Sequence, residues 1–115
     1  MSTIFTKIIQ KEIPADIVFE DDEILAFKDI HPLAPVHILI IPKKEIASIN
    51  DIEVADQMLI GKMVLVARNI AKNLNISSNG YKLLFRVGKH GGQEVDHVHV
   101  HLIGGAPLFE DIHPE

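Results

Sequence analysis

Apolar residues recur along this chain with two spacings, one typical of helices and one typical of strands. Between residues 4 and 13 the spacing is helical, and we expect a short amphipathic helix that ends before Pro14. Runs of alternating or continuous apolar residues, bounded by turn-forming residues, predict strands. These runs are residues 17–19, 24–27, 36–41, 81–87 and 95–103.

The longest helical pattern lies in the middle of the chain. Asn50 and Glu53 have the spacing of a helix N-terminal capping box, and the pattern predicts a helix over residues 52–74. Its apolar face is wide, because two neighbouring apolar stripes follow the same side. The stripes comprise Leu59, Met63, Val66 and Ile70 and, beside them, Ile60, Val64, Ala67 and Ala71. We expect this face to cover a sheet and to leave apolar surface for a second copy of the chain, in a homodimer.

Together these elements define a fold class. One long helix, a short N-terminal helix and about five strands with mostly short connections predict an α+β fold with an antiparallel sheet. The sequence has no internal repeat or linker, so residues 1–115 should form a single domain. With 47% hydrophobic and 23% charged residues, the composition excludes a disordered chain.

Composition and charge also exclude several classes of protein. The absence of cysteine rules out a disulfide framework, a thiolate zinc site and a thiol nucleophile. No apolar run approaches the ~20 residues that cross a bilayer, and the amino terminus has no signal-peptide pattern. We therefore expect a cytoplasmic protein with no membrane partner. Sixteen acidic against eleven basic side chains give a net charge of −5, which disfavours nucleic acid as a partner.

Histidine is the residue type with an unusual frequency, because the chain contains seven. In the last predicted strand His97, His99 and His101 alternate with apolar residues, so the three imidazoles should share one face. The opposite face should belong to the core. Imidazoles are poor core material, because each carries polar nitrogens that need partners when buried. The pattern therefore favours a chemical role over an exposed polar face.

A metal site is one such role, and strand geometry limits it. Alternate residues on a strand lie ~6.7 Å apart, so His97 and His101 are too far from each other to share one zinc ion with His99. A zinc ion would take at most two of the three, and His37, in the 36–41 strand, is the candidate for a further ligand. Our interpretation assigns no metal and no cofactor, and a zinc-binding protein remains an alternative.

Catalysis is the other role. A neutral imidazole can act as a nucleophile, while its neighbours fix its tautomer, donate to an anion or protonate a leaving group. The glycine-rich residues 88–93 precede the histidines, and glycines let backbone N–H groups approach a phosphate closely. Gln93 would add a donor. A phosphate held beside a nucleophile is the combination that these two segments predict.

The sequence resembles the histidine triad nucleotide-binding proteins, and most closely their nucleoside phosphoramidase branch. The shared motifs extend over nearly the whole chain. They are Ile4-Phe5, Ile13-Pro14, Phe27-x-Asp29-Ile30, Ala34-Pro35-x-His37, Ile41-Pro42-Lys43, Gly91-Gly92-Gln93, His97-x-His99-x-His101 and Gly104-Gly105. The resemblance implies the HIT-like fold and a dimer that continues one sheet across both subunits.

The resemblance also implies roles for the histidines. His99 matches the nucleophile that attacks the α-phosphorus and forms a covalent nucleotidyl-histidine, which water then cleaves. His101 matches the residue that contacts the phosphate and the bridging atom. His97 and His37 match the residues that orient this network. The implied activity is hydrolysis of a P–N or mixed-anhydride bond at the 5′-phosphate of a purine mononucleotide, an AMP or GMP derivative, without a required metal.

Further residues match the nucleotide site of the family. Asp29 matches the carboxylate that holds the ribose hydroxyls, and Gly92 with its neighbours matches the backbone donors to phosphate. The apolar walls around the purine are matched by Ile4, Phe5, Ile8, Phe27 and Ile30. Without the resemblance, these apolar positions would be interpreted as ordinary core.

Two residues depart from the pattern of this branch. Arg86 stands where an asparagine is usual near the phosphate and ribose, and Asp96 stands where an aromatic residue commonly precedes the triad. Arg86 could contribute a bidentate phosphate contact, or it could fill the site and change the substrate preference. A nucleotide-binding or interaction module without catalysis is therefore the first alternative to the hydrolase.

Overall fold

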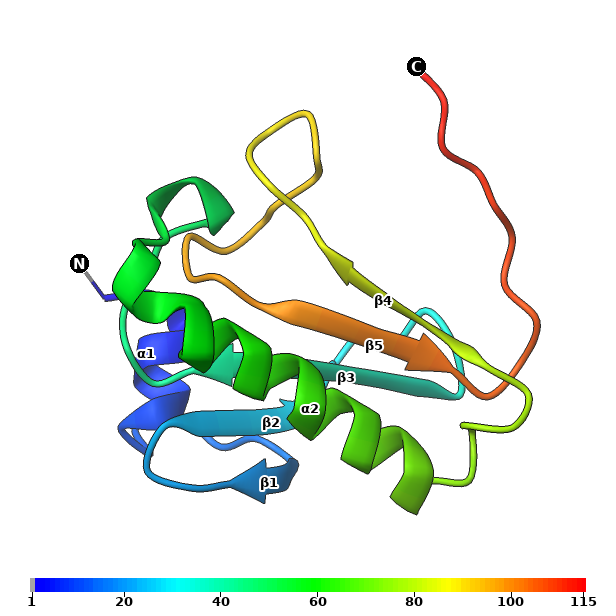
Figure 1. Cartoon of the computed structure of the whole chain (residues 1–115), viewed down its shortest axis with the longest axis horizontal. Helices are drawn as coiled ribbons and strands as arrows, with labels where there is room; N and C mark the ends of the chain where they lie inside the picture. The colour runs from blue at the N-terminus through cyan, green and yellow to red at the C-terminus, as the bar shows by residue number, and fades with distance from the viewer. Residues whose placement is uncertain (1) are drawn as a thin grey trace.

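The computed structural model describes residues 2–115. A five-stranded antiparallel sheet in the order β1-β2-β3-β5-β4 forms its centre (Figure 1). The strands are β1 (Ile17–Glu20), β2 (Ile24–Lys28), β3 (Val36–Pro42), β4 (Tyr81–Phe85) and β5 (Val100–Gly104). The predicted α+β class and antiparallel sheet are confirmed. Within residues 2–115 no helix combines the length and the apolar character needed to span a bilayer.

Each face of the sheet carries an apolar core beneath one helix. α2 (Gln57–Asn73) crosses one face (Figure 1). Its residues Met63, Val66 and Ile70 pack on the sheet. α1 (Ile4–Ile9) packs on the opposite face. The core on that side, here called the α1-face core, consists of Phe5, Ile8, Leu25, Phe27, Leu39 and Ile41. Successive side chains of a strand point to opposite faces, so β2 and β3, covered on both sides, have continuous apolar sequences.

The first helix is shorter than its apolar pattern predicts. The pattern extends to residue 13, but α1 ends at Ile9 and Gln10 is its C-terminal cap. Lys11 follows with a φ of 63°, which lies in the left-handed region and cannot continue a right-handed helix. At the other end Thr3 forms a capping box with Thr6, and Thr6 Oγ1 donates to Glu45 Oε1 at 3.0 Å. This bond ties the helix to the segment after β3.

The long helix begins later than predicted, and the predicted capping box at Asn50 and Glu53 is wrong. Two 3₁₀ turns, Ile49–Asp51 and Val54–Asp56, precede α2, which begins at Gln57. Ser48 caps the first turn, and Glu53 pairs with Asp56 in a box around the second. Ile52 has an extended backbone, with φ −69° and ψ 133°, and this interrupts helical continuity.

β5 also begins later than predicted. It covers Val100–Gly104 rather than residues 95–103, so His97 and His99 precede the strand. Val98 N donates to Ile46 O at 2.7 Å, which ties this segment to the loop after β3 and not to β4. β4 correspondingly ends at Phe85, two residues before the predicted end. The expected alternation nevertheless persists, because Val100 and Leu102 belong to the core beneath α2, whereas His97 and His99 pack against Phe5 on the opposite face.

Candidate active site

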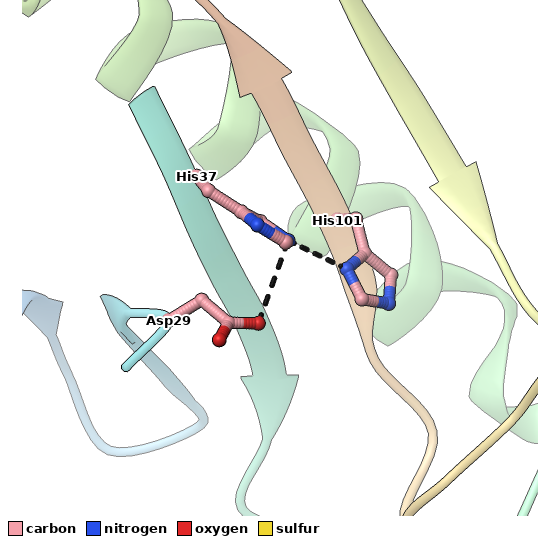
Figure 2. Close-up of side chains that lie close together, drawn as sticks. All are labelled: Asp29, His37 and His101. Carbon is pink, nitrogen blue, oxygen red and sulfur yellow. Dashed lines mark hydrogen bonds and ion pairs between the residues drawn. The ribbon is translucent and has the colours of Figure 1, made fainter. Parts of the chain in front are cut away.

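The site lies on the α1 side of the sheet, where imidazoles from two neighbouring strands meet. His37 comes from β3 and His101 from β5, and His37 Nε2 lies 2.9 Å from His101 Nδ1 (Figure 2). Asp29, which follows β2, approaches from the other side, with Oδ2 3.5 Å from His37 Nε2. Both imidazoles are at least nine-tenths buried. The structure thus brings His37, His101 and Asp29 together, although Asp29 was expected to hold the ribose and not to contact the histidines.

A chain of hydrogen bonds determines which nitrogens carry protons. The backbone N–H of Leu33 donates to His37 Nδ1 at 3.1 Å, so the proton of neutral His37 resides on Nε2. That N–H donates to His101 Nδ1, which leaves the His101 proton on Nε2. His101 Nε2 is buried and has no hydrogen-bond partner among residues 2–115. A buried donor without a partner costs free energy, so His101 offers a ready contact to a bound anion.

His99 has the opposite tautomer. Its Nδ1 lies 2.7 Å from the backbone carbonyl oxygen of His97, an acceptor, so Nδ1 carries the proton. Nε2 of His99 is therefore left with a free lone pair. The His99 ring lies 5.0 Å from the His101 ring and 5.0 Å from the Phe5 ring, measured between centroids. A nucleophilic nitrogen and a proton-bearing nitrogen thus come from adjacent imidazoles.

His97 has a different environment from the other two. Its Nε2 donates to the carbonyl oxygen of Pro42 at 2.7 Å, and the residue is 1% exposed. Its ring packs against Phe5 with a centroid separation of 6.0 Å. His97 therefore fixes the segment in the core, and its carbonyl orients His99.

Burial lowers the pKa of all four imidazoles. Burial is the main cause for His37, His97 and His99, and the charge of Arg86 lowers the pKa of His37 and His99 further. For His101, burial followed by the neighbouring charges of His99 and His37 lowers the pKa to about 4. The carboxylate of Asp29 opposes these shifts for His37, His99 and His101. At neutral pH the site therefore consists of neutral imidazoles.

These pKa shifts predict acid sensitivity. The unfolded chain takes up protons on its histidines near pH ~6.5, whereas the folded site resists protonation, so the free energy of unfolding decreases as the pH falls. The loss should extend from there to about pH 4, the folded pKa of His101. Thermal unfolding should give a clearly lower Tm at pH 5 than at pH 7.5. His90→Gln, at an exposed histidine, should keep this profile, and an unchanged Tm across the range would contradict the assignment of neutral buried imidazoles.

The predicted purine walls divide into buried and exposed residues. Phe5, Ile8 and Phe27 belong to the α1-face core, and the rings of Phe5 and Phe27 meet edge to face at 5.5 Å. Ile4 is 48% and Ile30 81% exposed, so both have surface that a ligand could cover. Asp29 Oδ1 accepts a hydrogen bond from His31 N at 2.8 Å, which fixes the carboxylate at the edge of this apolar region.

The glycine-rich loop differs from the expected phosphate cradle. Gln93 Nε2 donates to Ala47 O at 2.7 Å and to Val95 O at 3.0 Å, so the expected donor from Gln93 is used within the protein. The N–H of Gly92 likewise donates to Lys89 O at 3.1 Å. Neither group is free for a phosphate in this conformation. The expectation that they donate to the ligand is not supported, because both brace the loop.

The donor atoms near the site also bear on the zinc alternative. One ligand atom each from Asp29, His37 and His101 lies within 4.8 Å of the others. This cluster includes His37, as the sequence suggested, but it uses one triad histidine and a carboxylate that was not assigned to a metal. A zinc ion there would have to replace the hydrogen bond between the two imidazoles.

Backbone groups account for the features that sequence reasoning missed. The tautomers depend on Leu33 N, Pro42 O and His97 O, and no side-chain pattern identifies a backbone partner. Pro42 lies 55 residues from His97 in the sequence. Only the pairing of β3 with β5 brings these segments together.

Known proteins with similar sequences and structures identify the family of this chain. Residues 10–108 match the HIT domain family. The chain is 51% identical over 106 residues to the purine nucleoside phosphoramidase of Escherichia coli (strain K12), an alignment that covers 92% of this chain and 89% of that protein. A HIT family hydrolase from Legionella pneumophila superposes with a TM-score of 0.92 at 50% identity, covering 94% of this chain and 96% of the other. A histidine triad protein from Clostridium difficile gives 0.92 at 38% identity, with 97% and 100% covered. The expected HIT-like fold is confirmed, and the chain belongs to the HIT domain family.

Proposed function

We propose that this protein is a purine nucleoside phosphoramidase that works through a covalent intermediate on His99. The observation that carries the proposal is the hydrogen bond from His99 Nδ1 to His97 O, which leaves a lone pair on Nε2. The 51% identity to a purine nucleoside phosphoramidase supports the reaction class. A neutral histidine with a lowered pKa is already in the form that attacks phosphorus.

In the first step, Nε2 of His99 forms a bond to the α-phosphorus and the P–N bond to the leaving amine breaks. The amine needs a proton, and His101 Nε2–H is the donor beside it. His37 Nε2–H, bonded to His101 Nδ1, stabilises the His101 ring as it changes protonation. In the second step, water attacks phosphorus, His101 takes up a proton, and His99 Nε2 leaves. The products are the amine and the nucleoside monophosphate.

A direct assay tests the reaction. Purified protein incubated with adenosine or guanosine 5′-phosphoramidate should release ammonia and the nucleoside monophosphate in equal amounts. Comparison of the two substrates determines the base preference. Binding of both nucleotides without ammonia release would instead favour the non-catalytic nucleotide-binding module.

We assign the ribose contact to Asp29. Its carboxylate is at the edge of the apolar region formed with Phe27 and is held by His31 N. Asp29→Asn keeps the acceptor for His31 and should weaken ribonucleotide binding by about 1–3 kcal/mol, the range for hydrogen bonds to a charged group. Binding of 2′,3′-dideoxy analogues should change much less. Calorimetry that gives the same loss for both ligands would exclude a contact between Asp29 and the ribose hydroxyls.

The cluster of Asp29, His37 and His101 supports zinc binding as a second candidate function. Activity that survives extensive chelation would separate the hydrolase from a zinc-dependent protein. Metal analysis of the chelated protein provides the control. Loss of activity that zinc restores would replace our proposal with the second one.

The proposed homodimer rests on apolar surface that this chain leaves uncovered. On α2, Val64 is 40% exposed, whereas the exposed Leu65 lies on the other side of the helix, beside Val18 and Phe19 of β1. β4 is an edge strand, and all its residues are partly exposed. An apolar edge strand beside an apolar helix face is a surface that a second copy can cover. A dimer that pairs both features would extend the sheet across two subunits.

Sedimentation at micromolar concentration tests this assembly. We expect a species of twice the 12.8 kDa chain mass. Val64→Glu should shift the protein toward the monomer, because a charge would enter the interface. The exposed Lys89→Gln serves as a control that leaves the dimer intact. A single wild-type species near 12.8 kDa would exclude the dimer.

A further inference from the structure

Arg86 places a positive charge beside the histidines without a carboxylate to neutralise it. It follows β4 directly, and its charge acts on His37, His99 and His101. The guanidinium lies over Gly92: a Cβ on that glycine would be 3.6 Å from Nη1 of Arg86. Its hydrogen bond to Gly91 O is long, at 3.5 Å, and no carboxylate within residues 2–115 forms an ion pair with it. Arginine has five N–H donors, so this half-buried group has several to offer a ligand.

The charges on the two sides of the site are opposite. Two charged groups influence the pKa values of His37, His99 and His101. The carboxylate of Asp29 raises these pKa values, and the guanidinium of Arg86 lowers them. They are attached to different strands: Asp29 follows β2, Arg86 follows β4, and the histidines of β3 and β5 lie between them in the sheet. The site is therefore polarised along the sheet from β2 to β4.

If the proposed function holds, the positions of these two charges determine the direction in which a substrate lies across the sheet. A nucleotide with its ribose at Asp29 and its phosphorus at His99 extends from the β2 side to β5. Besides the ribose oxygen, phosphorus carries two nonbridging oxygens and the leaving amine, and the next strand in the sheet after β5 is β4, which Arg86 follows. The loop donors of Gly92 and Gln93 are used internally, so Arg86 is the strongest anion-binding group on that side.

We infer that Arg86 is a specificity residue that binds an anionic group on the leaving amine, so that the protein prefers nucleoside phosphoramidates of carboxylate-bearing amines. A phosphoramidase must release an amine, and an amino acid is the simple amine that carries a carboxylate close to its nitrogen. Arginine binds a carboxylate with two parallel hydrogen bonds, which a neutral amide of the same shape does not reproduce. The inference rests on the proposed function and adds to it the class of leaving group.

A matched pair of substrates tests this selectivity. The adenosine 5′-phosphoramidates of glycine and of glycinamide differ in one charged group, and kcat/KM is measured for both. Wild type should favour the glycine compound, and Arg86→Gln should reduce the ratio of the two kcat/KM values by about tenfold or more, as expected for loss of a charge-assisted hydrogen bond. Arg86→Lys should keep part of the preference. Lys89→Gln, at an exposed cation in the same loop, should leave the ratio unchanged.

Each contrary outcome has a distinct meaning. An equal loss for both substrates in Arg86→Gln would assign Arg86 to the phosphate shared by them and overturn its role in selectivity. An unchanged ratio would overturn that role as well, while turnover of the glycinamide compound would still support the phosphoramidase. Failure of wild type to cleave either compound would overturn the proposed function, and the inference about Arg86 with it.

Discussion

His99→Ala should lower the turnover of a purine nucleoside 5′-phosphoramidate by on the order of 10³-fold or more, because it removes the attacking nitrogen. Affinity for the nucleoside monophosphate should remain within a few-fold of wild type, since His99 is one of several contacts. Single-turnover kinetics and calorimetry measure the two quantities separately. His31→Ala, at an exposed histidine on a loop, is the matched control and should retain activity.

The structure explains why His99→Ala should reduce turnover strongly and nucleotide affinity only slightly. His99 is positioned by a bond to the backbone of His97, and its removal leaves that backbone, the His37 to His101 bond and Phe5 in place. Turnover within about tenfold of wild type would contradict nucleophilic catalysis by His99. A parallel loss of nucleotide affinity and turnover would assign His99 to binding.

His101→Ala should have the second largest effect, and that effect should depend on the leaving group. For an alkylamine, which must be protonated as it departs, we expect a loss of about 10²–10⁴-fold, the usual contribution of general acid catalysis. For an aryl oxide of low basicity, which departs without a proton, the loss should be much smaller. The comparison requires kcat for both substrates with wild type and variant.

The reason is the unpartnered donor of His101. Its Nε2–H is buried without a protein acceptor, while Nδ1 is held by His37. Burial lowers the pKa of His101 to about 4, so at neutral pH the ring is neutral and carries its one proton on Nε2, where it is available to a departing amine. Equal losses for the two leaving groups would show that His101 acts by holding the phosphate. Far-UV circular dichroism of the variant would verify that its fold is intact.

The sequence was sufficient to predict the elements whose residues repeat a simple pattern. The runs at 17–19, 24–27 and 36–41 are strands in the structure and agree with its limits to within one residue at each end. The apolar continuity of the last two runs reflects a sheet covered there on both faces, by α1 and α2. A chemical role for His99 and His101 was likewise predictable, because imidazoles that alternate with apolar core residues need polar partners when they are buried.

Boundaries that depend on distant contacts were not predictable. Asn50 and Glu53 have the spacing of a capping box, but the backbone at Ile52 is extended and delays α2 to Gln57. Residues 95–99 alternate like a strand, yet Val98 bonds to Ile46 outside the ladder. A residue pattern predicts which face of a strand a side chain lies on, but it does not predict which distant backbone group will form a hydrogen bond with the segment.

The same limit applies to the chemistry of the site. Gln93 was expected to donate to a phosphate, but its amide donates instead to the carbonyl oxygens of Ala47, which is 46 residues away in the sequence, and Val95. The distinct tautomers of His99 and His101 follow from one backbone carbonyl and one imidazole. Residue types identified the reacting groups, and only the folded chain assigns their protons.

The stereochemistry at phosphorus tests the central claim most directly. A nucleoside 5′-phosphoramidothioate of defined configuration, hydrolysed in isotopically labelled water, reports how many in-line displacements occur during turnover. Attack by His99 followed by attack by water gives two inversions, so we expect net retention of configuration. A single attack by water would give inversion, and that result would contradict a covalent intermediate on His99 whether or not the intermediate accumulates.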